Sequence, residues 1–215
     1  MNHQSVQRAI TPLRLIFWGG LICVIDLKFS ETTNGVGIQL DLLDDALGAV
    51  LIAVGVFKLS AIVVNHRYAT VMLFVQVVSI LFVVDAVFDH FVMPLSPPLR
   101  VAGEVFDFVT LLAIVAFCVA MRWFCETATL YRAAYSWWVT TFLFVVFYVV
   151  PLCLVELVRI PAMASGRILN LDLGLSCLLL PLLVVPITHL FVSTSRMKRA
   201  AERETMNTDA WHGPR

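Results

Sequence analysis

Apolar residues are gathered into long blocks along this chain, and most charged residues stand between the blocks. A bilayer core of roughly 30 Å is crossed by about 20 apolar residues in a helix. Backbone that faces lipid must satisfy its own N–H and C=O groups, so each block is interpreted as a helix. We therefore expect five clear membrane-spanning helices, at Ala46–Val64, Ala69–Met93, Ala102–Met121, Trp137–Val155 and Leu173–Val192.

A further apolar block, Leu15–Ile25, covers only eleven residues. It crosses the bilayer if its helix extends from Leu13 through Asp26–Phe29 into the interface; a re-entrant or tilted segment is the alternative and would leave five spans. Short connections favour antiparallel neighbours. We expect an all-α, polytopic membrane helix bundle with six transmembrane helices. It forms a single domain over residues 1–205, followed by a disordered cytoplasmic tail over residues 206–215.

The composition agrees with this interpretation. Hydrophobic residues make up 60% of the 215 residues, charged residues 14%, and the mean hydropathy is +0.90. A typical soluble domain is about 45–50% apolar and about 25% charged. Nucleotide-binding loops and nucleophile motifs are missing from the sequence, and nothing in it indicates nucleic-acid binding. Composition thus predicts where the protein resides, and leaves its activity open.

The charges are sorted between the two sides of the expected bundle. With six spans and both termini on one side, ten of the fifteen Lys and Arg residues fall on that side and four on the other, while Lys58 lies inside the second span. Loops rich in Lys and Arg remain in the cytoplasm. Both termini are therefore expected to be cytoplasmic, and the expected depth of Trp123, Trp137 and Trp138 at the inner interface agrees with this orientation.

Ionisable side chains gather at the outer ends of the third and fourth spans. Asp85 and Asp89 are four residues apart and share one helical face, and a short proline-rich link leads to the next helix. Acidic groups at membrane depth usually face a bundle interior or a wet cavity, and oxygen ligands suit hard cations. The alternative is a set of acids hydrated at headgroup height. The candidate ion or proton site comprises Asp85, Asp89, His90, Glu104, Asp107 and Asp45.

Other polar and small residues inside the spans have simpler explanations. Gly48 and Gly55 are seven residues apart and form a close-packing stripe on the second span. Gln76 and Ser79 share a face of the third span and are expected to make interhelical hydrogen bonds. His189 lies one turn from the inner end of its span, in the opposite leaflet from His90, so a two-histidine haem site is not supported. We expect no cofactor.

The start of the second span has a recognisable pattern. Its residues Asp41, Leu43, Asp45, Gly48 and Gly55 match a G-F-D-I-L-P-D-x-x-G-like stretch and its continuation, with Gln39 in place of glycine and Asp44 in place of proline. The segment resembles one that opens the second helix in a family of uncharacterised multi-pass bacterial membrane proteins. The resemblance covers about 45 residues. It implies a protein of the bacterial cytoplasmic (inner) membrane and carries no established activity.

Three classes of function remain open from the sequence. The first is a membrane-organising or partner-binding helical bundle, which contacts membrane lipids and other membrane proteins or a second copy of itself. The second is a proton- or cation-linked small transporter or channel that uses the outer carboxylates. The third is a membrane enzyme with a carboxylate-held metal, which requires at least three of those oxygens within about 2.0–2.6 Å of one ion.

Overall fold

The computed structural model describes seven stretches of the chain, at residues 3–24, 28–33, 36–41, 45–62, 64–91, 97–154 and 184–200. The chain divides into two compact units, Met1–Ala113 and Ile114–Arg215. Their boundary falls inside one long helix. The expectation of a single domain over residues 1–205 stays a prediction, and the tail at 206–215 lies outside the described residues.

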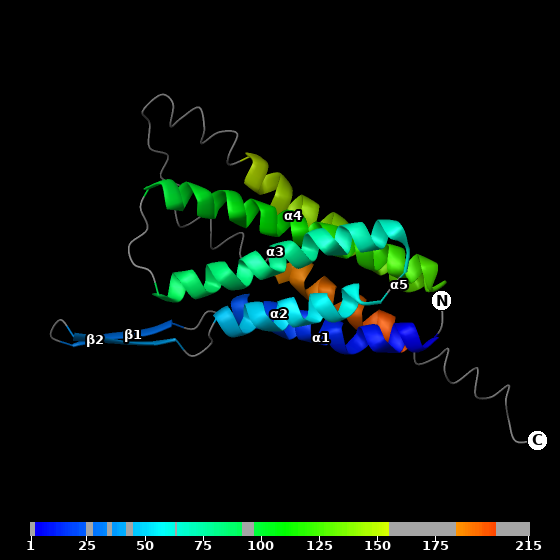
Figure 1. Cartoon of the computed structure of the whole chain (residues 1–215), viewed down its shortest axis with the longest axis horizontal. Coiled ribbons are helices and arrows are strands. Elements are labelled where there is room, and N and C mark those ends of the chain that lie inside the picture. The colour runs from blue at the N-terminus through cyan, green and yellow to red at the C-terminus, as the bar shows by residue number, and fades with distance from the viewer. Residues whose placement is uncertain are drawn as a thin grey trace, which may run out of the picture. The chain divides into compact units, whose positions relative to one another are not determined.

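Helices dominate both units, as the sequence predicts (Figure 1). Within the described part of the chain, three stretches are long and apolar enough to cross a membrane: His66–Val87, Val105–Thr127 and Tyr131–Leu154. The count of six spans stays a prediction. The helices are α1 (His3–Val24), α2 (Asp45–Ser60), α3 (His66–Phe91), α4 (Pro97–Thr127), α5 (Tyr131–Phe144), which continues through the π-helical turn η1 (Val145–Val149) to Leu154, and a last helix at 184–200.

The first helix differs from its prediction at both ends. It begins at His3, ten residues before Leu13, because Val6, Ala9 and Leu13 recur at helical spacing and are buried. Its polar residues occupy the opposite face and lower the mean hydropathy of the segment, so the start of this helix does not appear as an apolar block in the sequence. The extension through Asp26–Phe29 on which spanning was made to depend is not formed, since α1 ends at Val24 and Lys28 begins a strand.

A β-hairpin follows α1, in a segment for which no strand was predicted (Figure 1). Strand β1 (Lys28–Thr33) pairs antiparallel with β2 (Val36–Asp41), and the register sets Lys28 opposite Asp41 and Thr33 opposite Val36. The two residues between the strands are Asn34 and Gly35 in the sequence. This dipeptide is the strongest short-range signal for a two-residue hairpin turn, so the hairpin was detectable from the sequence.

Helices α1 and α2 pack backbone against backbone in the first unit. A methyl group at Gly48 would lie 2.8 Å from the carbonyl oxygen of Gly19 and 2.5 Å from Sγ of Cys23. A methyl group at Gly55 would lie 2.7 Å from the carbonyl oxygen of Pro12. Only glycine permits so close an approach. The predicted close-packing stripe of Gly48 and Gly55 is therefore confirmed, and α1 is the helix that it contacts.

Helices α2 and α3 are held together by polar contacts near their short connection. The Tyr68 hydroxyl donates to the carbonyl oxygen of Leu59 at 3.0 Å, and Gln76 Nε2 donates to Ser60 Oγ. The interhelical bond predicted for Gln76 is thus confirmed. The one predicted for Ser79 is wrong, because its hydroxyl donates to the Gln76 carbonyl of its own helix at 2.8 Å. A serine in a helix often bonds back to the preceding turn.

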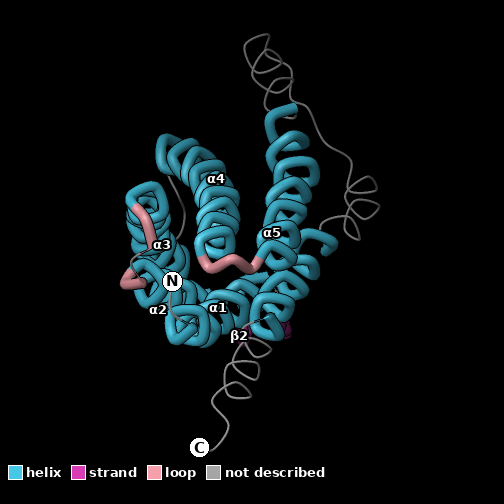
Figure 2. The backbone as a smooth tube through the Cα atoms, turned by 90° about the vertical axis from the view of Figure 1, so that its right-hand side faces the viewer, coloured by secondary structure: helices cyan, strands magenta, loops and turns pink. Residues whose placement is uncertain are grey.

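A tight turn connects α4 to α5 in the second unit (Figure 2). The Leu130 N–H donates to the Cys125 carbonyl at 2.9 Å, and the Thr129 N–H donates to the Glu126 carbonyl at 3.1 Å. Thr129 has a φ of 61°, in the left-handed region. This pair of bonds is the Schellman motif that commonly ends helices, with threonine at the position usually taken by glycine. The turn fixes where α5 begins.

Candidate functional site

The predicted outer carboxylates lie on the helices where the sequence set them. Asp85 is half-buried on α3, Asp107 is exposed on α4, and Asp45 is half-buried in the first turn of α2. Asp89, His90 and Glu104 belong to α3 and α4, and their side chains lie outside the described residues. Among the side chains that are described, no three His, Cys, Asp or Glu residues are placed to hold a metal. The convergence of the six stays a prediction.

Asp45 also contributes to the start of its own helix. It lies in the first turn of α2, where a negative charge is favourable beside the positive end of the helix dipole. Its carbonyl oxygen accepts a hydrogen bond from Sγ of Cys23 at 3.7 Å, which ties the start of α2 to the end of α1. Asp45 therefore has a local role whether or not it joins the other acids.

A polar network that sequence reasoning missed lies between α5 and the helix at 184–200. Ser136 and Thr140 project from α5, and His189, Ser193 and Arg196 project from the other helix. Thr140 Oγ1 lies 2.9 Å from His189 Nδ1 and 2.7 Å from Ser193 Oγ, and Ser193 Oγ lies 2.9 Å from Ser136 Oγ. Arg196 donates to Ser136 Oγ at 3.3 Å. We call these five residues the hydroxyl–imidazole network.

One end of the network can only donate, because a guanidinium has no acceptor, so Ser136 Oγ accepts from Arg196. A hydroxyl oxygen has two lone pairs, so either hydroxyl can be the donor in the Ser136–Ser193 and Thr140–Ser193 contacts. Thr140 Oγ1 can also donate to the Ser136 carbonyl oxygen, which lies 3.0 Å away. His189 Nδ1 faces Thr140 Oγ1 at 2.9 Å and Ser193 Oγ at 3.4 Å, and it accepts or donates according to its tautomer.

The three hydroxyl groups at the centre of this network are fully buried, whereas Arg196 is exposed and His189 is half-buried. Such a chain can hold two helices together, since interhelical bonds of this kind contribute about 0.6–2 kcal/mol in a membrane. It can also fix the orientation and the tautomer of the His189 imidazole. The sequence signal was present: Ser136 and Thr140 share a helix face at i and i+4, as do His189 and Ser193.

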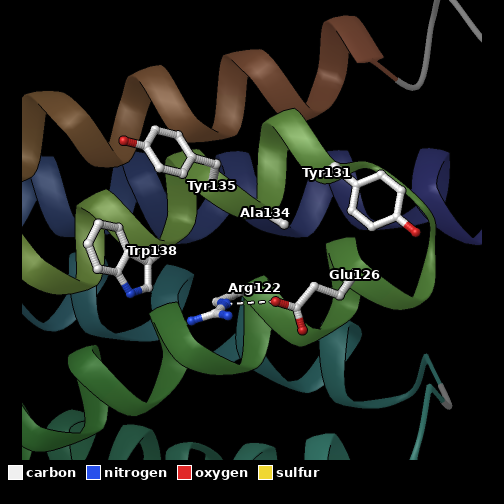
Figure 3. Close-up of a pocket in the computed structure, with 6 residues that line it drawn as sticks. All are labelled: Arg122, Glu126, Tyr131, Ala134, Tyr135 and Trp138. Carbon is white, nitrogen blue, oxygen red and sulfur yellow. Dashed lines mark hydrogen bonds and ion pairs between the residues drawn. The ribbon is translucent and has the colours of Figure 1, made fainter.

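A second polar feature of this unit is a pocket of about 380 Å³ between the last turns of α4 and the start of α5 (Figure 3). Arg122 Nε donates to Glu126 Oε1 at 2.7 Å across its floor. Three aromatic rings project from α5 around this ion pair. We call the feature the aromatic pocket; its lining residues are Arg122, Glu126, Tyr131, Ala134, Tyr135 and Trp138.

Comparison of the chain with protein-family models, curated proteins and solved structures gave no match in any of the three. The resemblance of the Asp41–Gly55 segment to bacterial multi-pass membrane proteins stays an expectation from the sequence.

Proposed function

We propose that this chain is a multi-pass integral protein of the bacterial cytoplasmic membrane, with six spans and both termini in the cytoplasm. The exposed face of α3 is the observation that carries this proposal. Its outward side chains are 40–60% exposed and apolar along about four turns of the helix. Soluble monomers rarely expose apolar patches of this extent. The residues of this face are Leu73, Val77, Ile80, Val84 and Val87.

Within the membrane, the protein acts as a membrane-organising bundle that packs against other helices, with a second copy of the chain as the simplest partner. Helix association in lipid depends on close van der Waals packing and on interhelical hydrogen bonds. The described helices use both devices internally, at Gly48 and at Thr140. The exposed apolar face of α3 can make van der Waals contacts of this kind with a helix of another molecule.

Membrane integration is tested first, by alkaline carbonate extraction and by mapping tags at both ends of the chain. The protein is expected in the carbonate-resistant pellet, with both tags accessible only from the cytoplasmic side. Extraction into the soluble fraction would overturn the membrane proposal. Tags on opposite faces would overturn the even number of spans and leave membrane residence intact.

The organising role is tested by fluorescence energy transfer between two labelled populations in vesicles of increasing lipid content. Association of copies is expected to persist on dilution, and Val77→Trp is expected to weaken it, because a bulky ring disturbs a packed interface while lipid accommodates it. Val105→Trp is the matched control, since Val105 is also exposed and apolar but lies on α4. If energy transfer fell, at the first increase in lipid content, to the value expected for randomly distributed molecules, self-association would be rejected.

A second candidate function is proton- or cation-linked transport, and the hydroxyl–imidazole network favours it. Ionisable groups within spans often mark proton relays. In such a protein His189 would be the proton-carrying group of the second unit, and Asp85 and Asp107 are the acids that the sequence offers in the first unit. Proton uptake by vesicles that contain the protein is expected to fall strongly in His189→Asn and in Asp85→Asn. Thr188→Val is the control, because its hydroxyl bonds only within its own helix among the described contacts. Equal uptake in all variants would remove this candidate.

A further inference from the structure

We propose that the aromatic pocket and the exposed apolar stripe of α5 together bind one zwitterionic phospholipid of the cytoplasmic leaflet. The pocket takes the phosphate and the amine of the headgroup, and the stripe takes an acyl chain. This inference rests on the proposed membrane placement and deepens it by naming a lipid class. It uses residues of the second unit alone.

The charges of the pocket match a headgroup that carries one phosphate and one amine. Among the described contacts Arg122 is paired with Glu126 through Nε, and a guanidinium has five N–H donors, so its other donors suit a phosphate. The Glu126 carboxylate and the faces of nearby aromatic rings suit an ammonium group. Because the pair has no net charge, an anionic headgroup would bring a second negative charge beside Glu126 without a compensating cation.

The order of these groups along the helices also matches a phospholipid. Glu126 and Tyr131 lie at the turn between α4 and α5, while Arg122 lies one helical turn further along, towards Trp138 (Figure 3). In a phosphoethanolamine or phosphocholine lipid the amine is outermost, the phosphate is deeper, and the acyl chains follow. The pocket presents the Glu126 carboxylate, the Arg122 guanidinium and the apolar wall at Trp138 in this same order.

Helix stability does not account for the ion pair. Glu126 lies in the last turn of α4, beside the negative end of the helix dipole, where a cation would be favourable. An acidic residue is also better placed four residues before its basic partner than after it, and here Arg122 precedes Glu126. Both effects favour the opposite arrangement of the two charges. A ligand with a fixed order of phosphate and amine explains the arrangement present.

An aromatic and aliphatic stripe continues from the pocket along α5. Tyr131 and Tyr135 are 72% and 65% exposed, and the Trp138 ring stacks with the rings of Tyr135 and Phe142, at 6.0 Å between centroids in each case. The exposed stripe then runs through Phe142, Val146, Val150 and Leu154. From Phe142 to Leu154 a helix rises about 18 Å, which is close to one leaflet of a hydrocarbon core of roughly 30 Å.

The test is native mass spectrometry of the full chain, released from bilayers that contain equal amounts of phosphatidylethanolamine, phosphatidylcholine and phosphatidylglycerol. We expect one retained phospholipid, with either zwitterionic lipid preferred over phosphatidylglycerol by about tenfold. The double variant Arg122→Glu with Glu126→Arg keeps an ion pair and reverses its order, so it is expected to lose this preference. Arg132→Gln, an exposed cation that does not line the pocket, is expected to keep it.

A second variant covers the event that the reversed pair fails to fold. Glu126→Gln preserves the shape of the side chain and removes its negative charge, so phosphatidylglycerol should compete equally with the zwitterionic lipids. Glycerophosphoethanolamine, which lacks acyl chains, should not displace the bound lipid. Equal retention of all three lipids by the unaltered protein would overturn the inference, as would displacement by that soluble headgroup. Carbonate extraction of the same samples reports membrane integration separately, so either proposal can fail alone.

Discussion

In the contact between α1 and α2, backbone meets backbone at Gly19 and Gly48, whereas hydroxyl groups and an imidazole meet between α5 and the helix at 184–200. Both contacts join helices, but the first depends on the absence of side chains and the second on their polarity. In the membrane placement proposed above, lipid would supply no hydrophobic force between helices, so their association would require either tight packing or hydrogen bonds. An added side-chain atom is therefore expected to destabilise the first contact, and removal of a hydroxyl group is expected to destabilise the second.

The largest effect is expected from Gly48→Ala, which breaks the first kind of contact. The added methyl group would meet the Gly19 carbonyl and Cys23 Sγ, so the backbones of α1 and α2 must move apart. Overpacking of this kind costs about 1–3 kcal/mol, and a rigid backbone contact belongs at the upper end of that range. Unfolding in mixed micelles with increasing dodecyl sulfate measures the loss of stability.

Gly20→Ala is the matched control for this prediction. A methyl group at Gly20 has no atom within 4 Å, and alanine is the better helix former by about 1 kcal/mol. The control should therefore leave stability unchanged or raise it. If Gly48→Ala and Gly20→Ala behaved alike, the close approach of α1 and α2 would not be a source of stability.

A smaller loss is expected when Thr140→Val breaks the second kind of contact. Valine preserves the shape of threonine but removes the hydroxyl that lies against both His189 and Ser193. The expected cost is about 1 kcal/mol, in line with polar contacts between membrane helices. The same mixed-micelle unfolding checks it. Thr141→Val is the control, because the Thr141 hydroxyl donates to the Trp137 carbonyl of its own helix, and an equal loss there would contradict an interhelical role for Thr140.

The long apolar helices were predictable because each corresponds to one continuous run of apolar residues in the sequence. An apolar block of about twenty residues predicts α3 and α5 without reference to any neighbour. The start of α1 was not found this way, because only one face of it is apolar and Val6, Ala9 and Leu13 are diluted by polar residues. The hairpin was missed because only the apolar blocks were assigned to elements, and it lies in the segment between two of them.

Charged candidates were easier to find from the sequence than the hydroxyl–imidazole network. Asp85 and Asp107 stand out against apolar neighbours, whereas Ser136 and Ser193 are common residue types that carry no charge. The two serines are 57 residues apart in the chain, and their 2.9 Å contact depends on how each helix is rotated about its own axis. Periodicity gives the face of each helix separately, and it does not say which faces meet.

The smallest effect is expected from Thr129→Gly, which changes local backbone without touching either helix contact. Thr129 has a φ of 61°, where a side chain with a branched Cβ is strained by about 1–2 kcal/mol. Glycine relieves this strain but costs about 0.5–1 kcal/mol in the entropy of the unfolded chain. A net gain of about 0.5 kcal/mol should appear as a small rise in the midpoint of unfolding. Thr127→Gly lies two residues earlier, within α4, and should lower the midpoint instead. A loss in Thr129→Gly would mean that the bond from the Thr129 hydroxyl to the Ala128 carbonyl outweighs the backbone strain.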